Sequence, residues 1–104
     1  MVRNLDKQGF EGALRDSVRP AVVDFTVAWC PHCKRLRPVI EEIAAEHAGV
    51  IDVYYVDTDE QQALAERYDI MTVPTVLVFQ NGGVVGSAVN PRTKEALLDL
   101  IFKT

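Results

Sequence analysis

Residues 21–44 read AVVDFTVAWCPHCKRLRPVIEEIA, and this stretch decides the fold that we predict. Residues 21–27 are an almost unbroken apolar run, which is typical of a strand buried on both faces of a covered parallel sheet. Residues 32–47 place their apolar side chains on one helical stripe. The stretch therefore predicts a strand followed at once by a helix, with Cys30 and Cys33 at the junction between them.

The remainder of the chain alternates the same two patterns. Residues 50–56 and 75–80 read as strands, and Asn81-Gly82 predicts a hairpin turn into a return strand at residues 84–89. Further helices are expected over residues 6–16 behind an Asp6 cap, from an Asp59 cap to about Tyr68, and from an Asn90 or Thr93 cap toward the C-terminus. A short strand at residues 2–5 would be the fifth. The order predicts one α/β domain over residues 1–104, in which about four helices flank a central mixed sheet of four or five strands.

Composition and charge narrow the classes of function. The chain has 104 residues, 48% of them hydrophobic and 25% charged, which suits a globular domain that needs no disulfide staples. Its net charge is −4 and no Lys/Arg run exceeds two residues, so we expect neither a nucleic-acid nor a membrane partner. Residues 1–12 lack the apolar core of a secretory signal, and we therefore expect a cytoplasmic protein.

The two cysteines could form a staple, half of a metal site or a working dithiol. A disulfide between Cys30 and Cys33 closes too short a loop to stabilise the fold much. A zinc site needs about four ligands, and His47 lies about 20 Å along the helix from Cys33, which leaves only His32 nearby. We therefore expect no metal, and a working dithiol is the favoured interpretation.

The position of Cys30 suits disulfide exchange. At the start of a helix its sulfur faces unpaired N–H groups and the positive end of the helix dipole, and both favour the thiolate. Pro31 fits the first helical turn, and Cys33 lies one turn further along. We expect Cys30 to attack a substrate disulfide and the more buried Cys33 to resolve the mixed disulfide.

Two further features point to the same chemistry. Asp24 interrupts the apolar strand, and a buried carboxyl with a raised pKa could exchange a proton with Cys33. Alternatively Asp24 faces the surface, since Val22 and Thr26 share its side of the strand. The Val73–Pro74 bond could be cis, which would expose the Val73 backbone to an extended substrate, or an ordinary trans bond.

The sequence resembles thioredoxins over essentially its whole length. Residues 23–44, VDFTVAWCPHCKRLRPVIEEIA, resemble the family segment VDFWAxWCGPCKxxxPxxxxxA, and residues 67–82, RYDIMTVPTVLVFQNG, resemble KYxIxxxPTLxxFxxG. The resemblance implies a thioredoxin fold, a Cys30–Cys33 redox disulfide and a catalytic role for Asp24. It also implies a substrate-binding surface at Trp29, Thr72, Val73, Pro74, Val89 and Asn90.

The chain departs from the family pattern at informative positions. Pro31-His32 replaces the usual Gly-Pro and matches both the dipeptide of the oxidant DsbA and the motif of a subgroup called desulfothioredoxin. His32 could tune the Cys30 thiolate by hydrogen bonding or positive charge, making the protein more oxidising, or could be a solvated residue without that role. Tyr55 replaces a lysine near the buried aspartate, so we expect the pKa of Asp24 to rise further.

These observations predict a monomeric dithiol–disulfide oxidoreductase that needs no cofactor of its own. It would reduce disulfide-containing proteins and be recharged by a thioredoxin-reductase-like flavoprotein. One alternative is a thiol oxidase or isomerase with a potential like that of DsbA, and another is a non-enzymatic binding module of the same fold. We expect a reduction potential between those of thioredoxin and DsbA, and closer to thioredoxin.

Overall fold

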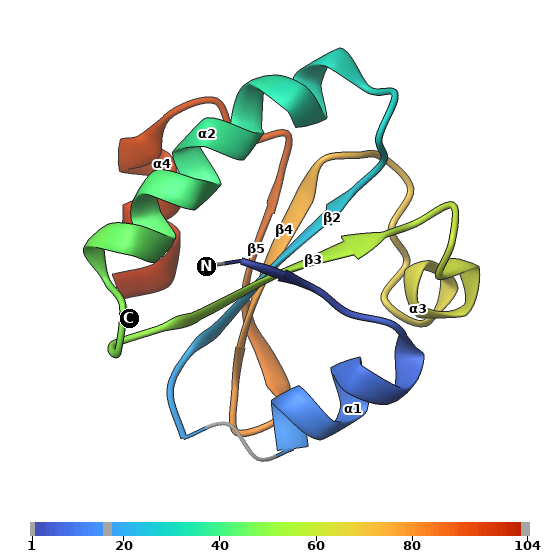
Figure 1. The fold of residues 1–104 in the computed structure, drawn as a ribbon, viewed down its shortest axis with the longest axis horizontal. Helices are drawn as coiled ribbons and strands as arrows, with labels where there is room; N and C mark the ends of the chain where they lie inside the picture. Colours follow the sequence, from blue (N-terminus) through green and yellow to red (C-terminus); the bar gives the residue numbers. More distant parts are fainter. Residues whose placement is uncertain (1, 16–17, 103–104) are drawn as a thin grey trace.

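The computed structural model describes residues 2–15 and 18–102, and it places them around one five-stranded sheet (Figure 1). The strands lie in the order β1-β3-β2-β4-β5. β1, β3 and β2 pair in parallel, whereas β4 is antiparallel to both β2 and β5. The strands are β1 Arg3–Asn4, β2 Ala21–Thr26, β3 Asp52–Asp57, β4 Thr75–Gln80 and β5 Gly83–Val89. The mixed sheet and its fifth short strand confirm the predicted fold class.

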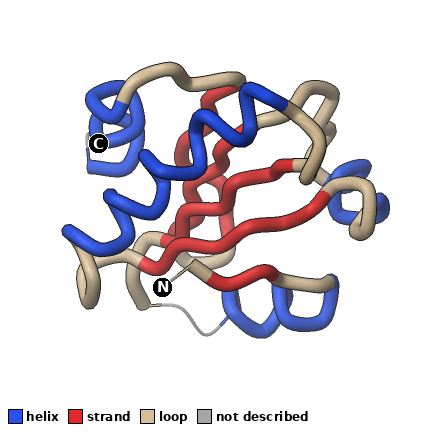
Figure 2. Tube along the Cα trace, turned by 45° about the horizontal axis from the view of Figure 1, so that its top comes forward, coloured by secondary structure: helices blue, strands red, loops and turns tan. Residues whose placement is uncertain are grey.

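Four helices cover the two faces of this sheet, as Figures 1 and 2 show. They are α1 Lys7–Arg15, α2 Pro31–Glu46, α3 Gln62–Arg67 and α4 Lys94–Phe102. α2 and α4 pack on one face, and α1 and α3 lie on the other. Along the described residues, no helix combines the length and the apolar character that crossing a bilayer requires.

The sheet separates two hydrophobic cores. The core beneath α2 and α4 contains Val22 and Val76 of the sheet, against Ile40 of α2. The core beneath α1 and α3 is built on Phe10 and Phe25, with several aromatic rings in edge contact. Every residue of β2 is buried, as an apolar run at the centre of a covered sheet requires.

Local sequence signals account for most of the element boundaries. The Asp6 carboxylate accepts a hydrogen bond from the Gly9 N–H at 2.7 Å and begins α1. Asn81 and Gly82 have φ values of 54° and 82°, which a tight hairpin turn needs and which these two residue types adopt readily. The Thr93 hydroxyl accepts the Ala96 N–H at 3.0 Å, so Thr93, rather than Asn90, caps α4.

The Asp59 cap that we predicted for α3 is wrong. The residue that precedes α3 is Gln61, and its side chain makes no capping hydrogen bond. The chain before it forms a turn in which the Asp57 carboxylate accepts the N–H groups of Asp59 and Glu60, at 2.8 and 3.1 Å. Asp59 thus remains outside the helix, and its carboxylate has a different partner, described below. Residue 16, the end of the first predicted helix, lies outside the described residues.

Candidate active site

The two cysteines lie at the first turn of α2, where the chain leaves β2. Cys30 is the N-cap residue, with extended φ and ψ angles of −86° and 123°, and its Sγ accepts the Cys33 N–H at 3.4 Å. Pro31 occupies the first helical position, where a missing N–H costs no hydrogen bond. Both cysteines are free thiols, so the structure describes the reduced state of the site.

The surroundings shift the two thiol pKa values in opposite directions. The Cys33 N–H lowers the pKa of Cys30 most, helped by the His32 N–H and the Arg35 guanidinium and opposed by burial. Burial raises the pKa of Cys33, which keeps 2% of its surface exposed against 6% for Cys30. The site therefore holds one thiol that ionises readily at its mouth and one that stays protonated behind it.

Alkylation should separate the two thiols. We expect iodoacetamide to modify Cys30 with a pH midpoint below that of an ordinary thiol, about 8.5, because the thiolate is the reacting species. Cys33 should react only at higher pH and more slowly. Peptide mass mapping of the reduced protein across a pH series measures both rates. A common midpoint for the two cysteines would contradict the asymmetry.

The structure changes the route by which His32 influences the thiolate. Its ring Nδ1 contacts the Arg35 guanidinium one helical turn away. The backbone N–H of His32, not its imidazole, lowers the pKa of Cys30. The positive charge near the sulfur belongs to Arg35, which sequence analysis missed although it lies at the i+3 position on the same helix face.

Asp24 lies in β2 beneath α2 and is 1% exposed, so the surface-facing interpretation is wrong. Neither carboxyl oxygen has a hydrogen-bond partner within the described residues. Burial raises the pKa of Asp24 from 3.8 to about 7, and the positive charge of Arg37 partly opposes the rise. Near neutral pH the carboxyl is therefore present in both protonation states, as proton exchange requires.

Tyr55, which sequence analysis placed near this carboxyl, has two partners on α2 that sequence analysis did not connect with the site. Tyr55 pairs with Asp24 in the β2–β3 register, and the Arg37 guanidinium lies 4.4 Å above the Tyr55 ring. The Tyr55 hydroxyl donates to Glu41 Oε2 at 2.6 Å. Arg37 thus supplies the cation that we expected the site to lack. Cys33, Arg37 and Glu41 are spaced four residues apart in the sequence. This spacing indicates that their side chains lie on one face of the helix.

The segment before β4 lies beside Cys30 and forms another wall of the site. The Val73–Pro74 bond is cis, and the Val73 carbonyl oxygen lies 3.9 Å from Cys30 Sγ. The Thr72 carbonyl accepts the Thr75 hydroxyl at 2.6 Å, and the Pro74 carbonyl accepts the Asn90 N–H at 2.7 Å. The first bond lies within the segment, and the second joins the segment to the loop after β5. Val89, the last residue of β5, pairs with Thr75.

Trp29 stands at the outer edge of the same site. Its side chain is 69% exposed, although it directly precedes Cys30. The indole Nε1 donates to Asp59 Oδ2 at 2.8 Å, and this contact joins segments thirty residues apart in the sequence. The expected substrate-binding residues are therefore gathered around the dithiol. Within the residues that the structure describes, no three His, Cys, Asp or Glu side chains are grouped to hold a metal ion.

Comparisons with known proteins agree with this geometry. The family model described as Thioredoxin matches residues 1–103. The chain is 38% identical over 102 residues to "Thioredoxin M-type, chloroplastic" of Spinacia oleracea, which covers 98% of this chain and 56% of the spinach protein. It is 39% identical over 82 residues to "Thioredoxin" of Staphylococcus aureus, which covers 79% of each protein. The chain thus spans little more than half of the spinach relative and most of the bacterial one.

Proposed function

This chain belongs to the thioredoxin family of thiol–disulfide oxidoreductases, and on that premise we propose that it reduces protein disulfides through Cys30 and Cys33. The observation that carries the proposal is the position of Cys30 at the start of α2, where its Sγ accepts the Cys33 N–H at 3.4 Å and Cys33 lies buried behind it, an arrangement that lowers the pKa of Cys30 and raises that of Cys33. A pair in which one thiol is ionised and the other protonated is ready to attack a disulfide and then to resolve the product.

The first step forms a mixed disulfide. The Cys30 thiolate attacks one sulfur of the substrate disulfide, the substrate S–S bond breaks, and the departing thiolate takes a proton from solvent. Trp29 and the Val73 backbone flank the reacting sulfur and receive the substrate chain. An extended substrate segment pairs with that backbone in the manner of an added strand.

The second step releases the substrate. Cys33 loses its proton to the Asp24 carboxylate and attacks Cys30 Sγ, which forms the Cys30–Cys33 disulfide and frees the second substrate thiol. Two electrons pass from the protein to the substrate. The pKa of Asp24, about 7, lets the carboxyl accept this proton near neutral pH and return it to solvent afterwards.

A dithiol that works as a reductant has to be recharged. A thioredoxin-reductase-like flavoprotein supplies the two electrons in this proposal, and the chain itself acts as a monomer without a bound cofactor. The reducing direction suits the cytoplasm, where thiols are kept reduced. Nucleic acid and membrane surfaces have no part in it, in keeping with the net charge of −4.

One observation favours a second candidate, a more oxidising enzyme that makes or isomerises disulfides. The Arg35 charge and the His32 N–H both stabilise the Cys30 thiolate, and whatever stabilises the reduced form raises the reduction potential. The remaining site, with its buried Asp24, matches the family's reducing members more closely. A potential between the two extremes therefore fits the site best.

Two measurements test the direction of electron flow. We expect the protein to accelerate dithiothreitol-driven precipitation of insulin, because it passes electrons to the insulin disulfides. Equilibration with glutathione should give a potential nearer to about −270 mV than to about −120 mV, the values of thioredoxin and DsbA. A potential as high as that of DsbA, with faster oxidation of reduced peptides than reduction of insulin, would overturn the reductase assignment.

A further inference from the structure

A groove beside the dithiol differs in charge from the rest of the molecule. It has a volume of about 290 Å³ and lies between the first turns of α2 and the loop that leads into α4. Its walls are His32, Arg35, Leu36 and Val39 of α2 and residues 90–92 of the loop. Two arginines and a histidine thus line it together with apolar side chains, and no carboxylate is among these residues. The whole chain, by contrast, has a net charge of −4.

The position of these charges is not explained by the stability of α2. The first turn of the helix has no acidic residue and its last turn has no basic one. Lys34, Arg35 and Arg37 lie in the half that begins at Cys30, although the helix dipole favours negative charge there. The basic end of α2 coincides instead with the reactive sulfur, and Arg35 is close enough to lower the pKa of Cys30.

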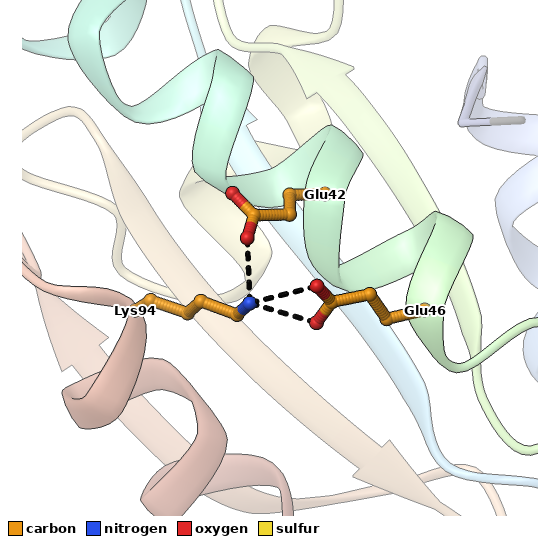
Figure 3. A network of polar contacts seen from close by, with 3 residues as sticks. All are labelled: Glu42, Glu46 and Lys94. Carbon is orange, nitrogen blue, oxygen red and sulfur yellow. Dashed lines mark hydrogen bonds and ion pairs between the residues drawn. The ribbon is translucent and has the colours of Figure 1, made fainter.

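Contacts on both sides hold the groove in shape. Lys94 bridges Glu42 and Glu46 of α2 at 2.6 and 2.7 Å, and Figure 3 shows these three side chains converging between α2 and α4. This contact fixes the start of α4 two residues after Arg92. At the other end, the Asn90 N–H donates to the Pro74 carbonyl, which joins the groove wall to the cis-proline segment beside Cys30.

From this arrangement we propose that the groove selects protein disulfides that have acidic side chains next to them. The inference rests on the proposed reducing function and names the substrate class of the same site. The guanidinium groups of Arg92 and Arg35 bind a substrate carboxylate, and the neighbouring disulfide then contacts Cys30 Sγ. Guanidinium groups suit this task because they bind carboxylates through two parallel hydrogen bonds. Leu36 and Val39 contact the aliphatic part of the bound segment.

Matched peptide disulfides test the proposal. Two peptides differ only beside one half-cystine, where one has Asp-Asp and the other Asn-Asn. The second-order rate constant for each with the reduced protein is divided by its rate constant with dithiothreitol in 1 M salt, which corrects for the peptide's own reactivity while screening its repulsion of the dithiothreitol thiolate. The quotient for the acidic peptide over that for the neutral one is the preference ratio. We expect a ratio of about five at low ionic strength, falling toward one in 1 M salt.

A preference ratio above one is diagnostic because the protein as a whole is negatively charged. If long-range charge alone governed the encounter, the acidic peptide would react more slowly and the ratio would be below one. Arg92→Gln should reduce the ratio by about half or more and Arg92→Glu should bring it below one. Arg35→Gln should also reduce it, and any change in Cys30 reactivity cancels because it affects both peptides.

Lys7→Gln is the matched control, because it removes one positive charge at the start of α1, away from the groove. It should leave the preference ratio unchanged. A wild-type ratio of one or less, or equal losses in Lys7→Gln and Arg92→Gln, would overturn the proposed selectivity. Failure of the protein to reduce the neutral peptide would instead refute the reducing function itself, so the two outcomes are distinguishable.

Discussion

Asp24→Asn should abolish a pH-dependent destabilisation of the wild-type protein. The wild type should lose free energy of unfolding as pH rises, by about 4 kcal/mol in total above pH 7. The folded protein raises the pKa of this carboxyl from 3.8 to about 7. Between these values the native state binds more protons at Asp24 than the unfolded chain does, so the free energy of unfolding falls as pH rises. Asparagine has nearly the same shape and does not titrate, so its variant lacks this slope.

Urea unfolding of both reduced proteins between pH 4 and pH 8.5 measures the effect. The difference in unfolding free energy should already be changing at pH 4, where the unfolded carboxyl titrates, and should shift in favour of Asp24→Asn until it becomes constant at about pH 7 to 8. Arg37→Gln provides an independent variant. Because Arg37 lowers the pKa of Asp24 in the folded protein, its removal should move the upper end of the window to higher pH and leave the lower end near 3.8. Parallel stability curves for Asp24→Asn and wild type would show that Asp24 titrates normally in the folded protein.

The expected cost identifies Asp24 as a residue that stability alone does not explain. It lies in the core beside Val22 and Val76, and neither of its oxygens has a partner in the part of the chain that is described. An apolar side chain would fit such a position at lower cost. The proposed exchange of a proton with Cys33 gives the carboxyl a role that an apolar residue could not perform.

The fold was readable from the sequence because its strongest signals are local. The apolar run that forms β2, the helical stripe of α2 and the Asn81-Gly82 turn each lie within a few residues and act through backbone geometry. The strand near residues 2–5 had the weakest sequence signal. The structure has a two-residue strand there, and it pairs with β3. Its formation depends on a distant partner more than on its own composition.

Errors arose where a side chain has a partner far along the chain. Asp59 looked like a helix cap, but its carboxylate accepts the Trp29 indole N–H instead. Tyr55 looked like the loss of a cation, yet Arg37 reaches across from α2 and stacks on the Tyr55 ring. Spacing within α2 indicates only that Arg37 shares a helix face with Cys33, whereas the partners of Arg37 and Asp59 lie on other segments of the chain. The cysteines were located correctly because the helix start positions them, whereas the electrostatic groups around them come from separate segments.

Cys30→Ser should lower the rate of disulfide reduction at least about a thousandfold, whereas Cys33→Ser should stop the reaction halfway. A serine hydroxyl at position 30 is not ionised near neutral pH and cannot replace the thiolate. Cys33→Ser keeps the Cys30 nucleophile but lacks the thiol that resolves the mixed disulfide. About one substrate should therefore remain attached to each protein molecule, and intact mass spectrometry measures this adduct directly.

The same pair of variants assigns the roles of the two sulfurs. Incubated with oxidised protein substrates, Cys33→Ser should accumulate adducts that dithiothreitol releases, and sequencing of the released partners identifies the substrates. Cys30→Ser should accumulate far fewer, because the remaining thiol is 2% exposed and has a raised pKa. Equal trapping by both variants would mean that either cysteine attacks, and the asymmetry of the site would have no kinetic role. If instead Cys30→Ser retained full function, the chain would act as a binding module through the surface around Trp29 and Val73, and the dithiol would be dispensable.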